Sequence, residues 1–291
     1  MLKNSLIFND KKIDLFIKKY VNKQNKSLLI KPMNYGVLSG GKKLRSSIIL
    51  SSGKLYSLEQ SKLLNICGAV ECIHSYSLIH DDLPCMDNDI LRRGKATAHI
   101  KYGEATAILA GNSLLTLAFE MIADKNFKIR DSYKVLLIKK LAECAGHAGI
   151  AGGQNLDLKF ENKKKSFQEI LDMQKKKTGK LFNFCCFAVG QIAGKNKKEI
   201  NKLSKIGEDI GLLFQLSDDF LDIKGKSSLT GKKVNKDKKK GKSTIINLMG
   251  YNNSYKYAVK LKKNILRNLK KHGKKAKDLK EIVNFILERK Y

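Results

Sequence analysis

The chain has 291 residues, and its 58 Lys and Arg against 27 Asp and Glu give a formal net charge of +31. Hydrophobic residues make up 42% and charged residues 29%, which excludes a disordered or collagen-like chain and predicts a globular fold. No stretch reaches the roughly 18 consecutive apolar residues that a membrane span needs, so we expect no transmembrane segment.

The chain reads as helical from end to end, and the alternation typical of strands is hard to find. Apolar residues at three- and four-residue spacing run from Leu63 to Ile73 and again from Ile206 to Leu216, which predicts helices in both places. Segments 105–123 and 133–150 are apolar on most sides, as expected for helices buried centrally in a bundle. The segment 255–291 is a basic amphipathic helical stretch with an interruption near Gly273.

Turn residues separate these helices. They lie at 39–41, 93–94 and 151–153 and in the polar stretch 224–243. None of these segments is long or unusual enough to be a domain linker, and no repeat at solenoid period is present. We therefore predict one all-α domain over residues 1–291, a helical bundle of ten or more helices.

The positive charge is spread along the chain. Only six basic residues are arginine, and lysine runs occur in several separate segments. Because lysine is among the least often buried residues, we interpret most of the excess as solvated surface shaped by compositional drift. A basic nucleic-acid-binding helical protein is the alternative from another class, but it needs arginine and aromatic residues interleaved along a basic patch. We expect no nucleic-acid partner.

The six cysteines form neither a CxxC pair nor a zinc spacing with histidine; they are Cys67, Cys72, Cys85, Cys144, Cys185 and Cys186. Free thiols in a chain that begins without a signal-peptide pattern are typical of a reducing cytosol. We therefore expect a cytoplasmic protein.

Carboxylates are scarce, yet two clusters of them stand out: Asp81, Asp82, Asp87 and Asp89 in the first, and Asp218, Asp219 and Asp222 in the second. On a helix, Asp218 and Asp222 share a face, with Gln215 one turn earlier on the same side. Pro84 prevents a regular helix in the first cluster, and a break there can bring Asp87 back to Asp81.

Two carboxylate stripes without a Cys or His ligand set suit a hard cation such as Mg²⁺, which typically shares its coordination shell with substrate phosphates. The alternative for either cluster alone is helix capping and surface ion pairs with lysine. For both clusters, embedded in apolar helices, burial without a cation costs roughly several kcal/mol per unpaired charge. The sequence therefore predicts a magnesium site.

Candidate phosphate ligands recur near glycine. Lys42 and Arg45 follow a glycine pair at 40–41, and Arg92 and Arg93 precede Gly94 directly after the first acidic cluster. Arginine grips phosphate oxygens with its planar fork. The segment GGKKLRSS lacks the spacing of a Walker loop. Further candidates are Lys177, Lys232 and Lys242, although a single lysine is more often solvated than functional.

Five motifs occur in an order that resembles the short-chain trans-prenyl diphosphate synthase family, and most of all its bacterial farnesyl diphosphate synthases. They are GGKKLR at 40–45, HSYSLIHDDLPCMDNDILRRGKATAH at 74–99, GGQNLD at 152–157, KTG at 177–179 and FQLSDDFLD at 214–222. The ending NFILERKY is also similar to the C-terminus of the family. The resemblance implies the isoprenoid synthase fold, an all-α bundle around a central cavity, formed by one polyprenyl synthase domain over 1–291.

The resemblance also implies the reaction. An allylic diphosphate ionises, isopentenyl diphosphate attacks the cation head to tail, and the released diphosphate takes the proton, so no dedicated protein base is needed. Three Mg²⁺ ions on the allylic diphosphate would be held by Asp81, Asp82, Asp87, Asp218, Asp219 and Asp222. A homodimer is expected, with apolar helices such as 105–123 as candidates for its interface.

By the same resemblance, the remaining site residues fall into three groups. The allylic diphosphate would be bound by Arg92, Lys177, Lys232 and Lys242, and isopentenyl diphosphate by Lys42, Arg45, Arg93 and His74, with His74 adding charge when protonated. The carbonyls or side-chain oxygens of Lys177, Thr178 and Gln215 would face the allyl cation, and Phe214 would orient the isopentenyl group.

Product length in the family depends on residues just before the first acidic cluster. Tyr76 lies five residues before Asp81 and Ser77 four before, so the ring would block chain growth about 7.5 Å along the helix. This favours the fifteen-carbon farnesyl product over the twenty-carbon one. A geranylgeranyl or geranyl diphosphate synthase is the alternative, and Tyr76 as an ordinary core residue is compatible with either.

The chain departs from the family at a few positions. Ser46, Ala96 and Ile246 stand where the family usually has proline, and Ile245 replaces an aromatic residue. Each missing proline is expected to remove about 0.4–1 kcal/mol of stability through the entropy of the unfolded chain. A non-catalytic subunit of a heteromeric synthase would be expected to lose one acidic cluster, and both are intact here.

Overall fold

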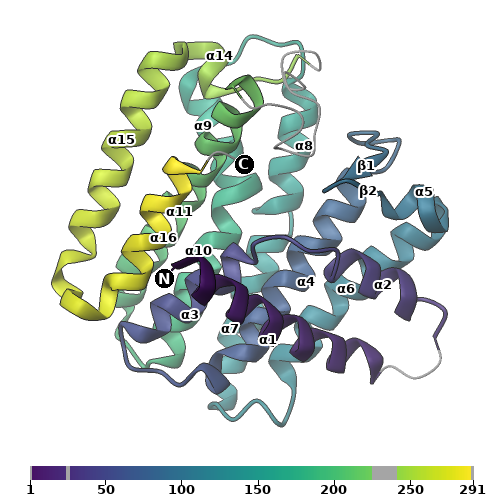
Figure 1. The fold of residues 1–291 in the computed structure, drawn as a ribbon, viewed down its shortest axis with the longest axis vertical. Coiled ribbons are helices and arrows are strands. Elements are labelled where there is room, and N and C mark those ends of the chain that lie inside the picture. The colour runs from purple at the N-terminus through teal and green to yellow at the C-terminus, as the bar shows by residue number, and fades with distance from the viewer. Residues whose placement is uncertain (1, 24–26, 225–240, 290–291) are drawn as a thin grey trace.

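Two pairs of packed helices form the centre of the molecule in the computed structural model, which describes residues 2–23, 27–224 and 241–289. In one pair α4 (Leu64–Asp81) packs against α6 (Glu104–Ala123), and in the other α10 (Lys180–Ile192) packs against α11 (Lys197–Lys224). The two pairs are joined by α3 (Leu44–Lys54), which contacts both α4 and α10 (Figure 1). All these helices contribute to one hydrophobic core.

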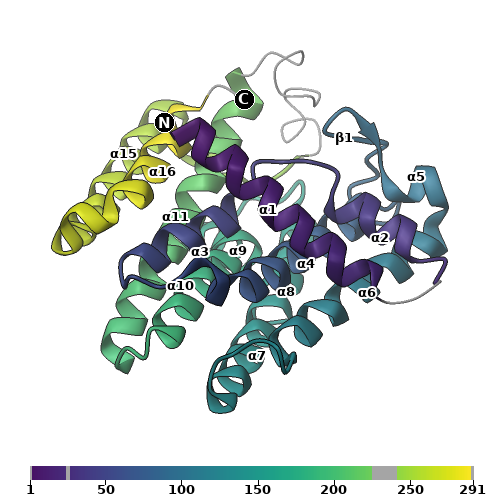
Figure 2. The same cartoon turned by 60° about the horizontal axis from the view of Figure 1, so that its bottom comes forward.

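Other helices and two 3₁₀ turns surround this centre. In chain order they are α2 (Ile30–Val37), α5 (Ala98–Tyr102), α7 (Asp131–Ala145), α8 (Ile150–Phe160), α9 (Phe167–Gln174), α14 (Ile245–Met249), α15 (Tyr251–Asn268) and α16 (Lys277–Glu288), with 3₁₀ turns at Gln60–Leu63 and Lys270–Ala276. The N-terminal helix α1 (Leu2–Asn22) crosses the front of the bundle and contacts α2, α3, α4 and α16 (Figure 2).

The apolar stripes of the sequence predict the central helices correctly. The stripe from Leu63 to Ile73 lies in α4 or directly before it, and the stripe from Ile206 to Leu216 lies in α11; the stripe residues of both are buried. The basic C-terminal stretch forms α15 and α16, and Gly273 interrupts it with a positive φ of 56°, which glycine adopts without a steric penalty.

The expectation that segments 105–123 and 133–150 are buried on most sides is wrong. On α6, Ile108 and Leu109 are exposed, and on α7, Val135 and Leu136 are exposed. These helices therefore bury one side and present apolar side chains on another. In the described part of the chain, only α6 is long and apolar enough to cross a membrane, and 44% of its most apolar window is buried against the bundle.

A short hairpin that periodicity did not reveal follows the first acidic cluster. Strand β1 (Leu91–Arg92) pairs antiparallel with β2 (Lys95–Ala96), with Arg92 opposite Lys95. The two turn residues, Arg93 and Gly94, have φ of 54° and 74°. The two-residue turn that matches the twist of the strands requires positive φ at both positions. The predicted turn at Arg93-Gly94 therefore determines where Arg92 and Arg93 lie.

Candidate active site

The first acidic cluster folds back on itself where α4 ends. The helix stops at Asp81, and after Pro84 the N–H of Asp87 donates to the carbonyl of Asp81 at 2.8 Å. The N–H of Asp89 donates in the same way to the carbonyl of Asp82 at 3.1 Å. The expected return of Asp87 to Asp81 is thus confirmed, and Pro84 is its physical cause because it cannot continue the helix.

This cluster carries negative charge that the protein compensates only partly. Burial, with smaller effects of Asp87 and Asp82, raises the pKa of Asp81 to about 6 against the opposing effects of Lys177 and Arg92. Carboxylate oxygens gathered in a buried place suit a hard cation. No group of three or more described His, Cys, Asp and Glu side chains is arranged to hold a metal by itself. The donor set therefore fits Mg²⁺ whose remaining ligands are water and phosphate oxygens.

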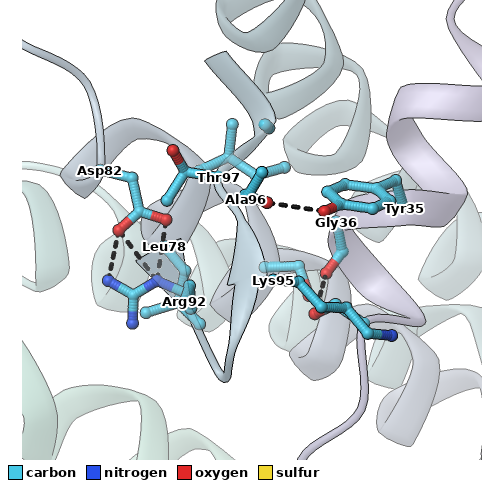
Figure 3. Close-up of a pocket in the computed structure, with 12 residues that line it drawn as sticks. Tyr35, Gly36, Leu78, Asp82, Arg92, Lys95, Ala96 and Thr97 are labelled. Carbon is cyan, nitrogen blue, oxygen red and sulfur yellow. Dashed lines mark hydrogen bonds and ion pairs between the residues drawn. The ribbon is translucent and has the colours of Figure 1, made fainter. Parts of the chain in front are cut away.

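Arg92 is bound to this cluster through Asp82. Its Nε donates to Oδ1 at 2.9 Å and to Oδ2 at 2.8 Å, and its Nη2 lies 2.5 Å from Oδ1 (Figure 3). The hairpin that carries Arg92 is held from the other side by Tyr35, whose hydroxyl donates to the carbonyl of Ala96 at 2.6 Å. The guanidinium is therefore fixed beside the acidic cluster.

The second acidic cluster lies on α11 and presents two faces. Asp219 accepts hydrogen bonds from Gln215 at 2.8 Å and from Gln174 at 3.1 Å. Asp218 instead pairs with Arg289 at 2.6 Å. Helical spacing predicts Gln215 on the same face as Asp218 and Asp222. In the structure the side-chain amide of Gln215 instead donates to Asp219, which also lies one turn away. Asp222 is half-buried.

Between the two clusters lies a buried network of lysines centred on Asp157. Its Oδ2 accepts from Lys177 at 2.6 Å and from Lys242 at 3.2 Å, and Lys242 also lies 3.3 Å from Asp87. Burial alone raises the pKa of Asp157, but the two ammonium groups outweigh it, so the pKa is lowered overall. The carboxylate is therefore ionised and holds two of the expected diphosphate ligands together.

The local backbone explains why Lys177 reaches this position. Residues Lys175–Gly179 form a π-helical turn between α9 and α10, an irregularity frequent at functional sites. A Cβ at Gly153 would lie 2.2 Å from the backbone nitrogen of Lys177, so only glycine allows α8 to approach this turn. Thr178 donates to Gln215 at 2.8 Å, which brings both residues to one small cavity with Lys177, Lys242 and Asp219.

The residues expected to bind isopentenyl diphosphate line a second, larger cavity, which we call the cation cavity. It has a volume of ≈ 420 Å³ and is lined by all four residues expected to bind isopentenyl diphosphate: Lys42, Arg45, His74 and Arg93. Arg93 lies against the glycine pair, donates to the carbonyl of Gly40 and would clash with a Cβ at Gly41, which has a φ of 116°. Phe214 and Asp218 line the same cavity.

His74 differs from the expectation that it adds positive charge when protonated. Burial lowers its pKa well below the ordinary value, and Arg45, Arg93, Arg92 and Lys43 lower it further. The imidazole is therefore neutral near pH 7. Arg45 is partly buried and lies over the ring of Phe182 at 4.7 Å.

Comparison with known proteins places this geometry in a family. The polyprenyl synthetase family model matches residues 26–286. The chain belongs to the polyprenyl synthetase family. The farnesyl diphosphate synthase of Escherichia coli is 39% identical to this family member over 90% of the chain and 89% of its own length.

Solved structures of the family have the same fold. The FPP/GFPP synthase of Zymomonas mobilis matches with a TM-score of 0.87 at 32% identity, covering 98% of both chains. The geranyltransferase of Helicobacter pylori, solved as a complex with magnesium and isoprenyl diphosphate, matches with a TM-score of 0.82 at 32% identity, covering 98% of this chain and 96% of its own. The expected isoprenoid synthase fold is confirmed.

Several charged residues of this polyprenyl synthetase site were missed by the sequence analysis. They are Lys43, Glu71, Asp157 and Arg289. Asp157 lies in the quoted GGQNLD motif, so its position beside the KTG motif was the available signal. Arg289 lies in the quoted C-terminal ending, stacks on Phe214 at 4.2 Å and lines the cation cavity. No sequence pattern pointed to Lys43 or Glu71, because their partners lie on distant segments.

Two other expected site residues, Tyr76 and Ser77, do not line these two cavities. Tyr76 is buried, its hydroxyl donates to the carbonyl of Ala145 at 3.3 Å, and its ring meets the edge of His80. The hydroxyl of Ser77 donates to the carbonyl of His74 within its own helix. Lys232 lies outside the described residues.

Proposed function

We propose that the protein is a Mg²⁺-dependent prenyltransferase that condenses isopentenyl diphosphate head to tail with dimethylallyl or geranyl diphosphate and makes farnesyl diphosphate. The observation that carries the proposal is the pairing of two sites. One is the cavity lined by Lys42, Arg45, His74 and Arg93. The other is the network of Asp157, Lys177 and Lys242, which lies between the two acidic clusters. The reaction needs such a pair, since one diphosphate must be activated while the other is only held.

The allylic diphosphate is assigned to the acidic side. Asp81, Asp82 and Asp87 on one side and Asp218, Asp219 and Asp222 on the other would hold up to three metal ions, as the similarity to a magnesium-bound relative supports. When bound, Mg²⁺ neutralises the charge that develops on the leaving diphosphate and so lowers the barrier to ionisation. Arg92, Lys177 and Lys242, with Lys232 expected beside them, would bind the same oxygens.

The chain's own residues would then stabilise the allyl cation. The hydroxyl of Thr178 donates a hydrogen bond to Gln215, so the lone pairs of the hydroxyl oxygen remain available to a nearby positive charge. Gln215 is held in turn by Asp219 through its amide nitrogen. Fixed dipoles of this kind act on the transition state without reorganising.

Isopentenyl diphosphate is assigned to the cation cavity. Lys42, Arg45 and Arg93 would neutralise its phosphates, and neutral His74 would add a hydrogen bond. Phe214, which lines the same cavity as Asp218, would orient the isopentenyl group toward the allyl cation. The departing diphosphate would take the proton that is lost after the new bond forms.

Product length is assigned to Tyr76 and Ser77. The ring of Tyr76 has a hydrogen bond to α7 and a contact with His80, and these contacts would hold it in place as a barrier to chain growth. The similarity to curated farnesyl diphosphate synthases of several bacteria supports the fifteen-carbon product.

Three further assignments belong to this proposal. Residues 1–291 would act as one polyprenyl synthase domain, and the protein would be cytoplasmic, in keeping with six free cysteines. It would be a homodimer that covers the exposed apolar side chains of α6 and α7, namely Ile108, Leu109, Val135 and Leu136.

The test is to incubate the purified protein with labelled isopentenyl diphosphate and geranyl diphosphate, with Mg²⁺ and with a chelator. We expect a fifteen-carbon diphosphate only when the metal is present. Absence of any product with Mg²⁺ would overturn the enzymatic assignment, and salt-sensitive retention on DNA in the same preparation would favour the nucleic-acid alternative.

A further inference from the structure

Lys43 lies in the sequence between Lys42 and Arg45, two expected ligands of isopentenyl diphosphate, but its ammonium group points into the protein. Its side chain is only 4% exposed. The ammonium donates to the carbonyl of Val37 at 2.6 Å and lies 3.2 Å from Oδ1 of Asp14. Lysine is rarely buried without partners, and these partners come from the end of α2 and from α1.

The backbone at Lys43 is as unusual as its side chain. Its φ of 36° and ψ of 44° place it in the left-handed region, which is strained for a non-glycine residue and persists only where surrounding contacts fix it. This residue directly precedes α3, so its conformation sets the direction in which the helix starts. Lys42, Lys43 and Arg45 all line the cation cavity, but the ammonium of Lys43 is directed at Val37 and Asp14.

The backbone before Lys43 supplies little restraint of its own. Gly40 and Gly41, which precede it, have φ of 90° and 116°, and glycine supplies little conformational restraint. Arg93, itself an expected substrate ligand, donates to the carbonyl of Gly40. The ammonium of Lys43 anchors the segment to α1 and α2 instead, through Asp14 and Val37, neither of which is an expected phosphate ligand.

The partners of Lys43 belong to a larger buried charge cluster. Glu71 is buried and accepts from the N–H and the hydroxyl of Ser46 at 3.2 and 2.7 Å. Asp10 of α1 is near enough to Glu71, Asp14 and Lys43 for all three charges to affect it. The cluster therefore links α1, the start of α3 and α4 at the wall of the cation cavity, which Lys43 and Glu71 line, one helical turn from His74.

From these contacts we propose that Lys43, held by Asp14, is a positioning residue for the isopentenyl diphosphate site. It fixes the left-handed turn that presents Lys42 and Arg45 to the phosphates and does not touch the substrate itself. The inference rests on the proposed function. It also gives α1, which contributes no expected ligand, a role in the affinity for one of the two substrates.

The test separates the two substrates. Lys43→Met keeps the length of the side chain and removes its charge. We expect the KM for isopentenyl diphosphate to rise between about tenfold and about a hundredfold, the range over which small misplacements act. The KM for geranyl diphosphate should stay near the wild-type value. Lys43→Arg, which retains the charge, should return the KM for isopentenyl diphosphate toward that value.

Two further variants make the result decisive. Asp14→Asn leaves Lys43 in place and removes its ionic partner, so it should reproduce the selective rise even where Lys43→Met fails to fold. Lys54→Met, at the other end of α3, removes an exposed lysine that pairs with Asp278 and should change neither KM. The inference is wrong if a folded Lys43→Met or Asp14→Asn variant raises the KM values for both substrates equally. It is also wrong if such a variant leaves both KM values unchanged. An inactive wild-type protein would instead defeat the proposed function.

Discussion

Arg92 binds both carboxylate oxygens of Asp82 through its Nε, at 2.9 and 2.8 Å. The pair joins a residue expected to bind diphosphate to a residue expected to bind metal. In Asp218 with Arg289 and in Asp157 with Lys177, one expected ligand likewise meets an opposite charge. Because unpaired buried charges are strongly destabilising, these pairs compensate one another's charge in the folded protein, and we expect metal and diphosphate to replace them as partners on binding.

Replacing Asp157 tests the lysine network. In Asp157→Asn, Lys177 and Lys242 lose the anion that holds them together, and their mutual repulsion separates them. We expect the KM for geranyl diphosphate to rise about tenfold, which corresponds to about 1.4 kcal/mol, while the KM for isopentenyl diphosphate changes little. Steady-state kinetics with each substrate varied in turn measures both.

The matched control is Asp172→Asn on α9, which removes a surface carboxylate that accepts from Gln168. It should have wild-type kinetics. A lower KM for geranyl diphosphate in Asp157→Asn would show that Asp157 competes with the substrate for the lysines instead of holding them in place.

Asp10 makes the stability of the protein depend on pH. Burial, then Glu71 and Asp14, raise its pKa from 3.8 to about 6 against the opposing effect of Lys43. The folded protein therefore holds this proton more tightly than the unfolded chain. The resulting stabilisation is complete below pH 3.8 and is lost as the pH rises through about 6.

Asp10→Asn removes the charge that appears over this range. We expect the variant to have a higher free energy of unfolding than the wild type at pH 8 and a much smaller advantage at pH 5. Urea unfolding at the two pH values measures the difference, and Asp131→Asn on the exposed start of α7 is the control. A difference that does not change with pH would contradict the assignment.

Ser46 shows that a missing proline can be compensated. It lies in the first turn of α3, where its N–H has no partner in the helix, and both this N–H and its hydroxyl bind Glu71. Ser46→Pro would gain about 0.4–1 kcal/mol from the unfolded chain. It would also leave a buried carboxylate without donors, at a cost of about 1–3 kcal/mol or more.

We therefore expect Ser46→Pro to lower the free energy of unfolding, and Ser46→Ala, which keeps the N–H, to lower it less. Chemical denaturation ranks the three proteins. A proline variant more stable than the wild type would mean that the two hydrogen bonds contribute little.

Tyr76 tests the assignment of product length. Tyr76→Ala removes the ring between α4 and the end of α7, so the expected product is longer than fifteen carbons. Tyr76→Phe keeps the ring, loses only the hydrogen bond to Ala145 and should still make the fifteen-carbon product. Chromatography of the dephosphorylated products distinguishes them, and an unchanged chain length in Tyr76→Ala would remove Tyr76 from this role.

Much of the fold and part of the site could be predicted from the sequence, because they depend on local patterns. The period of the apolar stripes gives α4 and α11, and Pro84 gives the return of Asp87 to Asp81. Periodicity did not reveal that α6 and α7 expose apolar side chains, since composition does not say which neighbours are present.

The missed residues share a different cause. Lys43 meets Asp14, and Asp218 meets Arg289, across long separations in the chain. The neutral state of His74 likewise depends on burial among cations from α3 and the β1–β2 hairpin. Such contacts exist only after the helices have packed, so spacing in the sequence cannot predict them.

The central claim is tested most directly by following labelled isopentenyl diphosphate into product with geranyl diphosphate and Mg²⁺, for the wild type, Asp81→Asn and Asp131→Asn. We predict farnesyl diphosphate from the wild type and Asp131→Asn, and a rate lower by about a hundredfold to a thousandfold in Asp81→Asn, the loss typical of removing an electrostatic contribution to the transition state. Equal rates for all three proteins, or no prenyl transfer by the wild type, would contradict the account.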